Sequence, residues 1–260
     1  MKTESRDSKD NIATVAAIGL LAYASADIAH HVFGHGAACL MLGGRIISLT
    51  SVFVNCSLTG ATIDLAGPFA NLILGLVALL IVRITNRASS AVRLFYILAA
   101  AFNLLWFALQ LVSSAARRID DWAWAMHQFH VSEPVRYVLI VIGALGYLLT
   151  VRVIATYMTA FAHPGARARR IVLIAWFTAG AIACATAAFD HHPGITLRRA
   201  IPQAMVLSIG LLFVPARASK LSGLGQDAAP LGLSFVWAAA AFIVGTASIL
   251  LLGPGFAIGF

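Results

Sequence analysis

Long apolar runs constrain the fold of this chain more than any other feature of its sequence. The 260 residues are 60% hydrophobic and 11% charged, whereas a soluble domain is about half apolar and about a quarter charged. So few charged side chains cannot cover a water-facing surface, and the excess of apolar surface excludes a disordered chain. A spanning helix needs roughly 20 apolar residues. We therefore expect an all-α polytopic membrane protein with six to seven transmembrane helices, whose partner is the lipid bilayer and not nucleic acid.

The order of the runs predicts how the chain is organised. The expected spans are residues 12–42, 66–84, 92–115, 137–161, 170–188 and 232–252. The run at 200–216 is short and bounded by proline, so it either spans the membrane or re-enters it. Residues 45–58 are β-branched and partly alternating, which predicts a short membrane-associated β-hairpin after the first span. We divide the chain into a disordered tail (1–10), a helical core (11–134) and additional transmembrane helices (135–260).

Positive charges are distributed unequally between the two sides of a seven-span chain. The side of the N-terminus holds Lys2, Arg6, Lys9, Arg83, Arg87, Arg93, Arg167, Arg169, Arg170, Arg217 and Lys220, and the opposite side holds Arg45, Arg117, Arg118, Arg136, Arg198 and Arg199. Cytoplasmic loops carry an excess of lysine and arginine. This distribution predicts a cytoplasmic N-terminus in a multi-pass protein of the bacterial cytoplasmic membrane.

The cysteine content predicts no disulfide framework. The chain has three cysteines, Cys39, Cys56 and Cys184, and two of them lie inside apolar runs. We interpret them as buried, inert thiols.

Four ionisable residues lie within nine positions of the first expected span: Asp27, His30, His31 and His35. On an α-helix His31 and His35 share one face, because they are four residues apart, and this spacing suits two ligands of one zinc ion. His30 and His35 are five apart and lie off one face. A third ligand must come from another segment, and Asp120 and Asp121 follow the third span on the same side of the membrane. Ionisable groups at membrane depth are costly and usually functional; polar packing between helices is the alternative.

Further motifs follow this cluster in a fixed order. They are His31-x-x-x-His35, Gly43-Gly44-Arg45 before the β-like segment, Ala66-Gly67-Pro68-Phe69-Ala70-Asn71, Phe102-Asn103-Leu104 and Asp120-Asp121-Trp122. This order, over about residues 12–123, resembles the site-2 protease family of membrane-embedded zinc metalloproteases. The resemblance implies a three-helix protease-like core, zinc bound by His31, His35 and Asp121, and Asn71 helping to hold an extended substrate. Asp121 is preferred to Asp120 because it directly precedes Trp122, as in a divergent branch of the family.

One departure from the family bears on catalysis. The family's catalytic glutamate follows the first histidine, and Val32 stands at that position. Valine neither takes nor donates a proton, and loss of general acid–base help costs about 10²–10⁴-fold in rate. Asp27 and Asp64 are weak candidates for a replacement base. Asp27 lies one turn before His31 and is better placed to accept a hydrogen bond from a ligand imidazole.

Three functions therefore remain open from the sequence. The first is a zinc metalloprotease-like protein whose peptide hydrolysis is weak or unconventional. The second is a catalytically inactive pseudoprotease that binds transmembrane segments of other proteins as a regulator or assembly factor. The third is a proton or solute transporter that uses the intramembrane aspartate and histidines.

Overall fold

The computed structural model describes residues 9–85, 89–162, 166–221 and 228–258. Within these residues, seven helices are long and apolar enough to cross a membrane: Ile12–Met41, Ala61–Ile84, Ser90–Arg117, Glu133–Phe161, Arg167–Ala188, Pro193–Leu221 and Phe235–Leu252. The expectation of a helical multi-pass membrane protein is confirmed at that level. Most of the tail expected at residues 1–10 lies outside the described residues.

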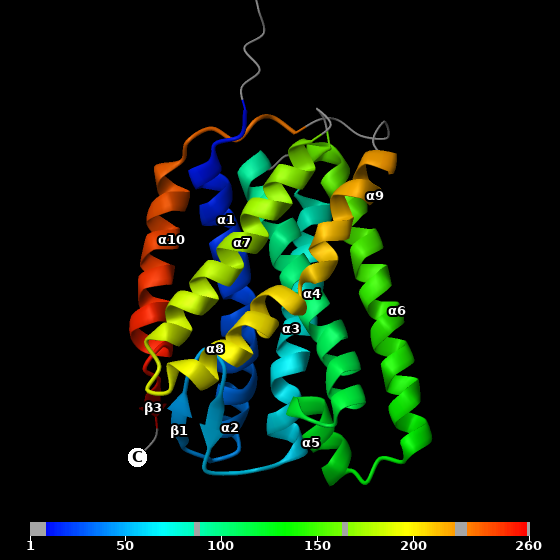
Figure 1. Cartoon of the computed structure of the whole chain (residues 1–260), viewed down its shortest axis with the longest axis vertical. Coiled ribbons are helices and arrows are strands. Elements are labelled where there is room, and N and C mark those ends of the chain that lie inside the picture. The colour runs from blue at the N-terminus through cyan, green and yellow to red at the C-terminus, as the bar shows by residue number, and fades with distance from the viewer. Residues whose placement is uncertain (1–8, 86–88, 163–165, 222–227, 259–260) are drawn as a thin grey trace, which may run out of the picture.

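Several of these helices combine regular and irregular turns. The first consists of α1 (Ile12–Ile28), η1 (Ala29–Gly36) and α2 (Ala37–Met41). The next are α3 (Ala61–Ile84), α4 (Ser90–Arg117), α6 (Glu133–Met158) with η2 (Thr159–Phe161), and α7 (Arg167–Ala188). The sixth consists of α8 (Pro193–Ile201), η3 (Pro202–Val206), η4 (Ile209–Phe213) and α9 (Val214–Leu221), and the seventh of α10 (Phe235–Ala247) and η5 (Ser248–Leu252). The long helices lie side by side, and α2, α5 (Asp120–Gln128), α8 and the strands gather at one end of the bundle (Figure 1).

The run at 200–216, which the sequence left as spanning or re-entrant, is part of the longer helical stretch Pro193–Leu221. Pro202 and Pro215 lie within it. Proline has no backbone N–H and interrupts the regular α-helical hydrogen bonds, so the stretch changes between α-, π- and 3₁₀-helical turns. It crosses the bundle obliquely from α8 to α9 (Figure 1).

The predicted hairpin is present, with a third strand that the sequence did not indicate. β1 (Ile46–Leu49) and β2 (Val54–Cys56) pair antiparallel, and β3 (Phe256–Ile258) pairs antiparallel with β1 to give the order β2-β1-β3. β3 comes from the glycine- and proline-rich end of the chain. The sheet therefore joins the segment after the first helix to the segment after the last.

A disulfide between Cys39 and Cys56 connects α2 to β2. The expectation of inert thiols is wrong for these two residues, because the hairpin folds back onto the end of the first helix and brings their sulfur atoms together. Cys184 is a free thiol. The bond fixes the hairpin to the helix that carries the histidines.

The core of the bundle is built around α4. In its most apolar 18-residue window 72% of residues are buried, compared with 22% in the outer helix Phe235–Leu252. Ile18 of α1, Phe102 of α4 and Ile171 of α7 are among the fully or almost fully buried side chains of the main apolar cluster. The exposed apolar faces of the outer helices are suited to contact with lipid acyl chains.

A polar cluster closes the end of the bundle opposite the sheet. The carboxylate of Asp10 accepts hydrogen bonds from Nε and Nη2 of Arg167, at 2.8 and 2.9 Å, and from the backbone N–H of Leu231 at 2.9 Å. Asp10 and Arg167 are largely buried as side chains. Burial alone raises the pKa of Asp10, but the hydrogen bonds from Arg167 and Leu231 and the charge of Arg167 hold that pKa below its usual range.

Candidate metal centre

The first transmembrane helix changes from α- to π-helical geometry where the histidines lie. The π-helical segment η1 contains His30, His31 and His35. In a π-helix each turn closes with i→i+5 hydrogen bonds, so residues five apart lie above one another. The expectation that His30 and His35 lie off one face, which assumed an α-helix, is wrong: their Nε2 atoms are 3.1 Å apart.

A close contact between glycines seats this helix on α3. A Cβ atom built on Gly34 would collide with the Cα of Gly67 and lie 2.8 Å from the carbonyl oxygen of Ala66. Small residues allow two helix backbones to approach within membranes. The approach also brings Nδ1 of His35 to 2.7 Å from the carbonyl oxygen of Ile63 in the first turn of α3.

The connection from α4 to α5 positions the acidic partner of the histidines. Arg118 and Asp120 both have left-handed backbone geometry, with φ of 58° and 68°, and this tight reversal turns the two neighbouring aspartates apart. Asp120 points to Arg199, with an Oδ1–Nη1 distance of 2.8 Å. Asp121 is buried and accepts a hydrogen bond from Nε2 of Gln110 at 2.8 Å.

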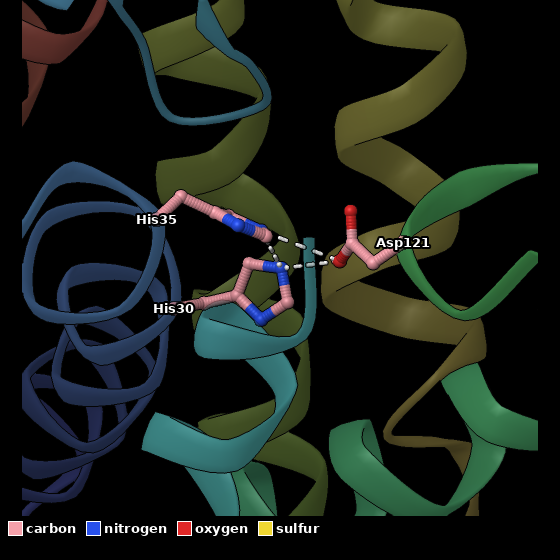
Figure 2. Close-up of side chains that lie close together, drawn as sticks. All are labelled: His30, His35 and Asp121. Atoms are coloured by element: carbon pink, nitrogen blue, oxygen red, sulfur yellow. Dashed lines mark hydrogen bonds and ion pairs between the residues drawn. The ribbon is translucent and has the colours of Figure 1, made fainter. Parts of the chain in front are cut away.

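His30, His35 and Asp121 together form a compact group, which we call the candidate ligand group. Oδ2 of Asp121 lies 3.1 Å from Nε2 of His30 and 3.3 Å from Nε2 of His35. The two histidines reach the group from η1 and the aspartate from the start of α5, so that three side chains converge (Figure 2). All three residues are buried.

Hydrogen bonds on the far side of each imidazole determine which ring nitrogen carries a proton. Nδ1 of His30 lies 2.6 Å from Oδ1 of Asn71, and the Asn71 amide nitrogen donates to the Ala26 carbonyl and to Asn103. Nδ1 of His35 faces the Ile63 carbonyl, which only accepts. Both Nδ1 atoms are therefore donors, and in neutral rings both Nε2 atoms are unprotonated acceptors.

The candidate ligand group consequently directs three acceptor atoms toward one point. Burial raises the pKa of the Asp121 carboxyl, but His35 and His30 lower it by more, so that the pKa lies well below its usual range. An ionised Asp121 therefore depends on a positive charge beside it, from a protonated imidazole or from a bound cation. Acceptors at these distances repel one another unless a cation or a proton lies among them.

The dimensions of the group fit a tetrahedral metal ion. Zinc–nitrogen and zinc–oxygen bonds are about 2.0–2.1 Å long, which sets ligand atoms about 3.3 Å apart around a tetrahedral ion. The three observed separations are 3.1, 3.1 and 3.3 Å. Two histidines and one carboxylate leave a fourth position for water or substrate, as in catalytic zinc sites.

A cavity of about 310 Å³ adjoins the group. It is lined by the ligand group, by Phe53 of the hairpin connection, and by residues of the sixth helical stretch such as Arg199 and Gln203. Residues from the 135–260 region, to which the sequence assigned no chemistry, therefore contribute to this cavity.

The other predicted site residues lie around the group in distinct environments. His31 lines the cavity but is outside the ligand group, and its Nδ1 lies 3.2 Å from Oδ1 of Asp27. Asn71 is fully buried and holds His30. Val32 packs against the apolar cluster beneath the hairpin. Asp64 lines the cavity and accepts a hydrogen bond from Gln128.

Four residues of the site had no assigned role in the sequence analysis. His30 was set aside on α-helical spacing. The only sequence signal of a deviation from an α-helix in this segment is weak: the two glycines Gly34 and Gly36, which disfavour a regular helix. Trp106 stacks on His30 with ring centroids 4.9 Å apart. Gln110 and Gln203 are single amides within apolar runs, and their partners are distant in sequence.

Comparison with known proteins gives no further identification. No protein-family model, no curated protein and no solved structure matches this chain. The resemblance to site-2 proteases therefore rests on the residues of this chain alone.

Proposed function

We propose that this chain is a membrane-embedded, zinc-dependent hydrolase of the site-2 protease type, with the metal bound by His30, His35 and Asp121. One observation carries the proposal: three buried side chains, two imidazoles and one carboxylate, direct their ligand atoms to one point at separations of 3.1–3.3 Å. A buried arrangement of this kind is costly without a cation. The acidic ligand is the one that the resemblance implies, while His30 replaces His31 as the first histidine.

The surrounding side chains have roles that follow from their contacts. A zinc ion bound here would polarise a carbonyl oxygen and activate water for hydrolysis. Asn71 fixes the His30 ring through Nδ1, and the Ile63 carbonyl fixes His35 in the same way. Gln110 donates to Oδ2 of Asp121 and holds the carboxylate toward the histidines. Such outer contacts raise the basicity of metal ligands and fix their orientation.

The substrate class follows from the resemblance and from the location of the cavity. The family cleaves peptide bonds within membrane segments, and the cavity here is lined by residues of several membrane-spanning helices, among them His30, Trp106 and Gln203. We propose an unwound portion of a transmembrane segment as the substrate. The cavity volume of about 310 Å³ suits the residues next to one scissile bond and not a whole helix.

We also infer that the cavity opens on the side of the membrane opposite the N-terminus, facing an oxidising compartment. Disulfides persist in oxidising compartments, and Cys39–Cys56 ends in β2 of the hairpin, whose residues Phe53 and Val54 line the cavity. The excess of lysine and arginine on the side of the N-terminus supports the same orientation.

Metal analysis of the purified protein tests the proposed function. We expect about one zinc ion per chain in detergent, measured by mass spectrometry of the metal. His30→Ala and Asp121→Ala should lose it, and His31→Ala, one residue away on the same helix, is the matched control that should retain it. Loss in His31→Ala with retention in His30→Ala would instead favour the ligand pair expected from α-helical spacing. No bound metal in the wild type would refute the proposal.

Hydrolysis needs a separate measurement. The probe is a set of peptides that each form one transmembrane helix, interrupted at its centre by an Asn-Pro pair. They are added to the protein in detergent micelles, and mass spectrometry identifies the products. We expect cleavage by the zinc-loaded wild type and none by His35→Ala. A metal-loaded protein that cleaves none of the peptides would favour the inactive, substrate-binding alternative.

A further inference from the structure

The position next to the first ligand of the group is occupied by a histidine that the ligand group does not use. His31 follows His30 directly, is buried, and lines the same cavity as the three ligands. Val32, the residue at the expected position of the base, packs away from this cavity against the hairpin cluster. The change of ligand pair therefore brings an imidazole to the place where the resemblance expects a carboxylate.

The contacts of His31 determine which of its nitrogens faces substrate. Nδ1 lies 3.2 Å from the carboxylate Oδ1 of Asp27 and 3.2 Å from the Asp27 carbonyl oxygen. Both oxygens only accept, so Nδ1 carries the proton and Nε2 is the acceptor nitrogen. Among the described residues, no protein group hydrogen-bonds to this Nε2.

Asp27 is itself held by Gln203, whose side-chain amide also bonds to the hairpin connection. Its Oδ1 accepts a hydrogen bond at 3.0 Å from Nε2 of Gln203 in η3. The same amide donates to the carbonyl oxygen of Ser51, in the hairpin connection, at 2.8 Å. A buried carboxylate within a transmembrane helix is costly and usually has a functional partner, and His31 is the ionisable side chain paired with it here.

We propose, on the basis of the proposed function, that His31 is the proton-transferring catalytic residue of this site and that Asp27 is its positioning residue. In many hydrolases the general base is an imidazole that a neighbouring carboxylate orients. Asp27 holds the ring through Nδ1 and leaves Nε2 available on the cavity wall, and Gln203, itself bonded to the Ser51 carbonyl, holds Asp27.

The reaction balances without any further reactant. The oxygen of a water molecule bonds to the scissile carbonyl carbon while Nε2 of His31 takes one proton from that water. The carbon–nitrogen bond then breaks, and Nε2 returns the proton to the leaving amine. Water is consumed, one carboxyl and one amine are formed, and His31 ends in its starting state.

Other groups near the cavity are less suited to this role. Asp64 lines the cavity, but its Oδ2 accepts the side-chain amide of Gln128. Asp120 is engaged by Arg199. His31 combines a free acceptor atom, a place on the cavity wall and a carboxylate that orients it.

Substitution at His31 separates catalysis from metal binding. His31→Gln and His31→Ala should retain one zinc ion per chain and lower the cleavage rate of the Asn-Pro peptides by about 10²–10⁴-fold. Asp27→Asn should lower kcat with an unchanged KM, because it alters the orientation of the base and not substrate contacts. His31→Glu should recover part of the rate, since glutamate also transfers protons.

Chemical labelling gives a readout that does not depend on turnover. Diethyl pyrocarbonate acylates accessible, unprotonated imidazole nitrogen, and peptide mapping identifies the labelled histidine. In the zinc-loaded wild type we expect label on His31 and none on His30 or His35, whose nitrogens are all engaged.

Each failure has a distinct signature. A wild type without zinc refutes the proposed function. A zinc-loaded wild type that cleaves nothing refutes the proposed hydrolysis and the catalytic assignment together, and leaves the metal site intact. Zinc-loaded His31→Gln that cleaves at the wild-type rate, or an unlabelled His31, overturns the catalytic assignment alone. Loss of zinc from folded His31→Gln also overturns it, because His31 would then support the metal.

Discussion

Replacement of Gly67 by alanine should displace a metal ligand without changing any ligand residue. The added Cβ would collide with Nε2 of His35 and lie 2.7 Å from Cε1 and 2.8 Å from Cδ2 of that ring. Ordinary contact begins at 3.4 Å and Cε1 lies at 2.7 Å, so the ring has to retreat by at least about 0.7 Å. Gly34, the residue before His35, also packs closely against the Gly67 backbone, so the helix that carries the histidines and α3 meet at the point where the methyl group is added.

The size of this displacement sets the expected loss of affinity. Metal–ligand distances are maintained within about 0.2 Å, and a shift of about 0.7 Å exceeds that tolerance more than threefold. Disturbing a group that only supports a ligand costs about 10–100-fold in metal affinity. Since Gly67→Ala moves a ligand itself, we expect a loss of at least about 100-fold, or about 2.7 kcal/mol.

Competition between the purified protein and a zinc-binding dye measures this affinity. Gly60→Ala is the matched control, because it lies just before the same helix, α3, and a Cβ there meets nothing within 4 Å. Size-exclusion profiles and thermal unfolding of both variants establish that they fold. A folded Gly67→Ala protein that binds zinc as tightly as the wild type would refute the assigned geometry of the site.

Three further predictions follow from contacts described above. Asn71→Ala should lower zinc affinity about 10–100-fold in the same dye assay, because a ligand imidazole loses its Nδ1 partner; unchanged affinity would contradict that role. Replacing Cys39 and Cys56 with serine should lower the free energy of unfolding by about 3 kcal/mol, given the 17-residue separation, and denaturant titration in detergent measures it. Asp10→Asn should cost about 2 kcal/mol at neutral pH. Arg167 lowers the pKa of Asp10 in the folded state, so the stability that this pair gives the wild type is lost as the pH falls below about 4. The difference in thermal unfolding between wild type and Asp10→Asn should therefore disappear at low pH. A difference that stays constant with pH would contradict the ion pair.

The transmembrane helices could be predicted from the sequence because the physical requirement is simple. A helix that crosses a bilayer needs roughly 20 apolar residues, and such runs are visible in composition alone. The strand β3 could not be predicted in this way. It has three residues, Phe256–Ile258, and pairs with β1, about two hundred residues earlier in the chain, so no local pattern indicates it.

The site was predicted in part, and the local geometry of one helix accounts for the difference. His35 and Asp121 belong to the candidate ligand group as expected. His30 was excluded because the spacing was interpreted with an α-helical period. Gln203 reaches Asp27 across 176 positions, a contact that only the folded chain reveals.

The π-helical turn of η1 can also be described as an insertion. A turn that closes from residue i to i+5 holds one residue more than an α-helical turn. Removing Val32 from the printed sequence leaves His30-His31-Phe33-Gly34-His35, in which the two ligand histidines are four positions apart and His31 follows the first. That is the spacing expected of the two histidines from the resemblance described above, with a histidine in place of the glutamate that follows the first. A search with fixed spacing selects His31 and His35 here and not the histidine pair of the candidate ligand group, so motif searches in membrane helices should allow for one inserted residue.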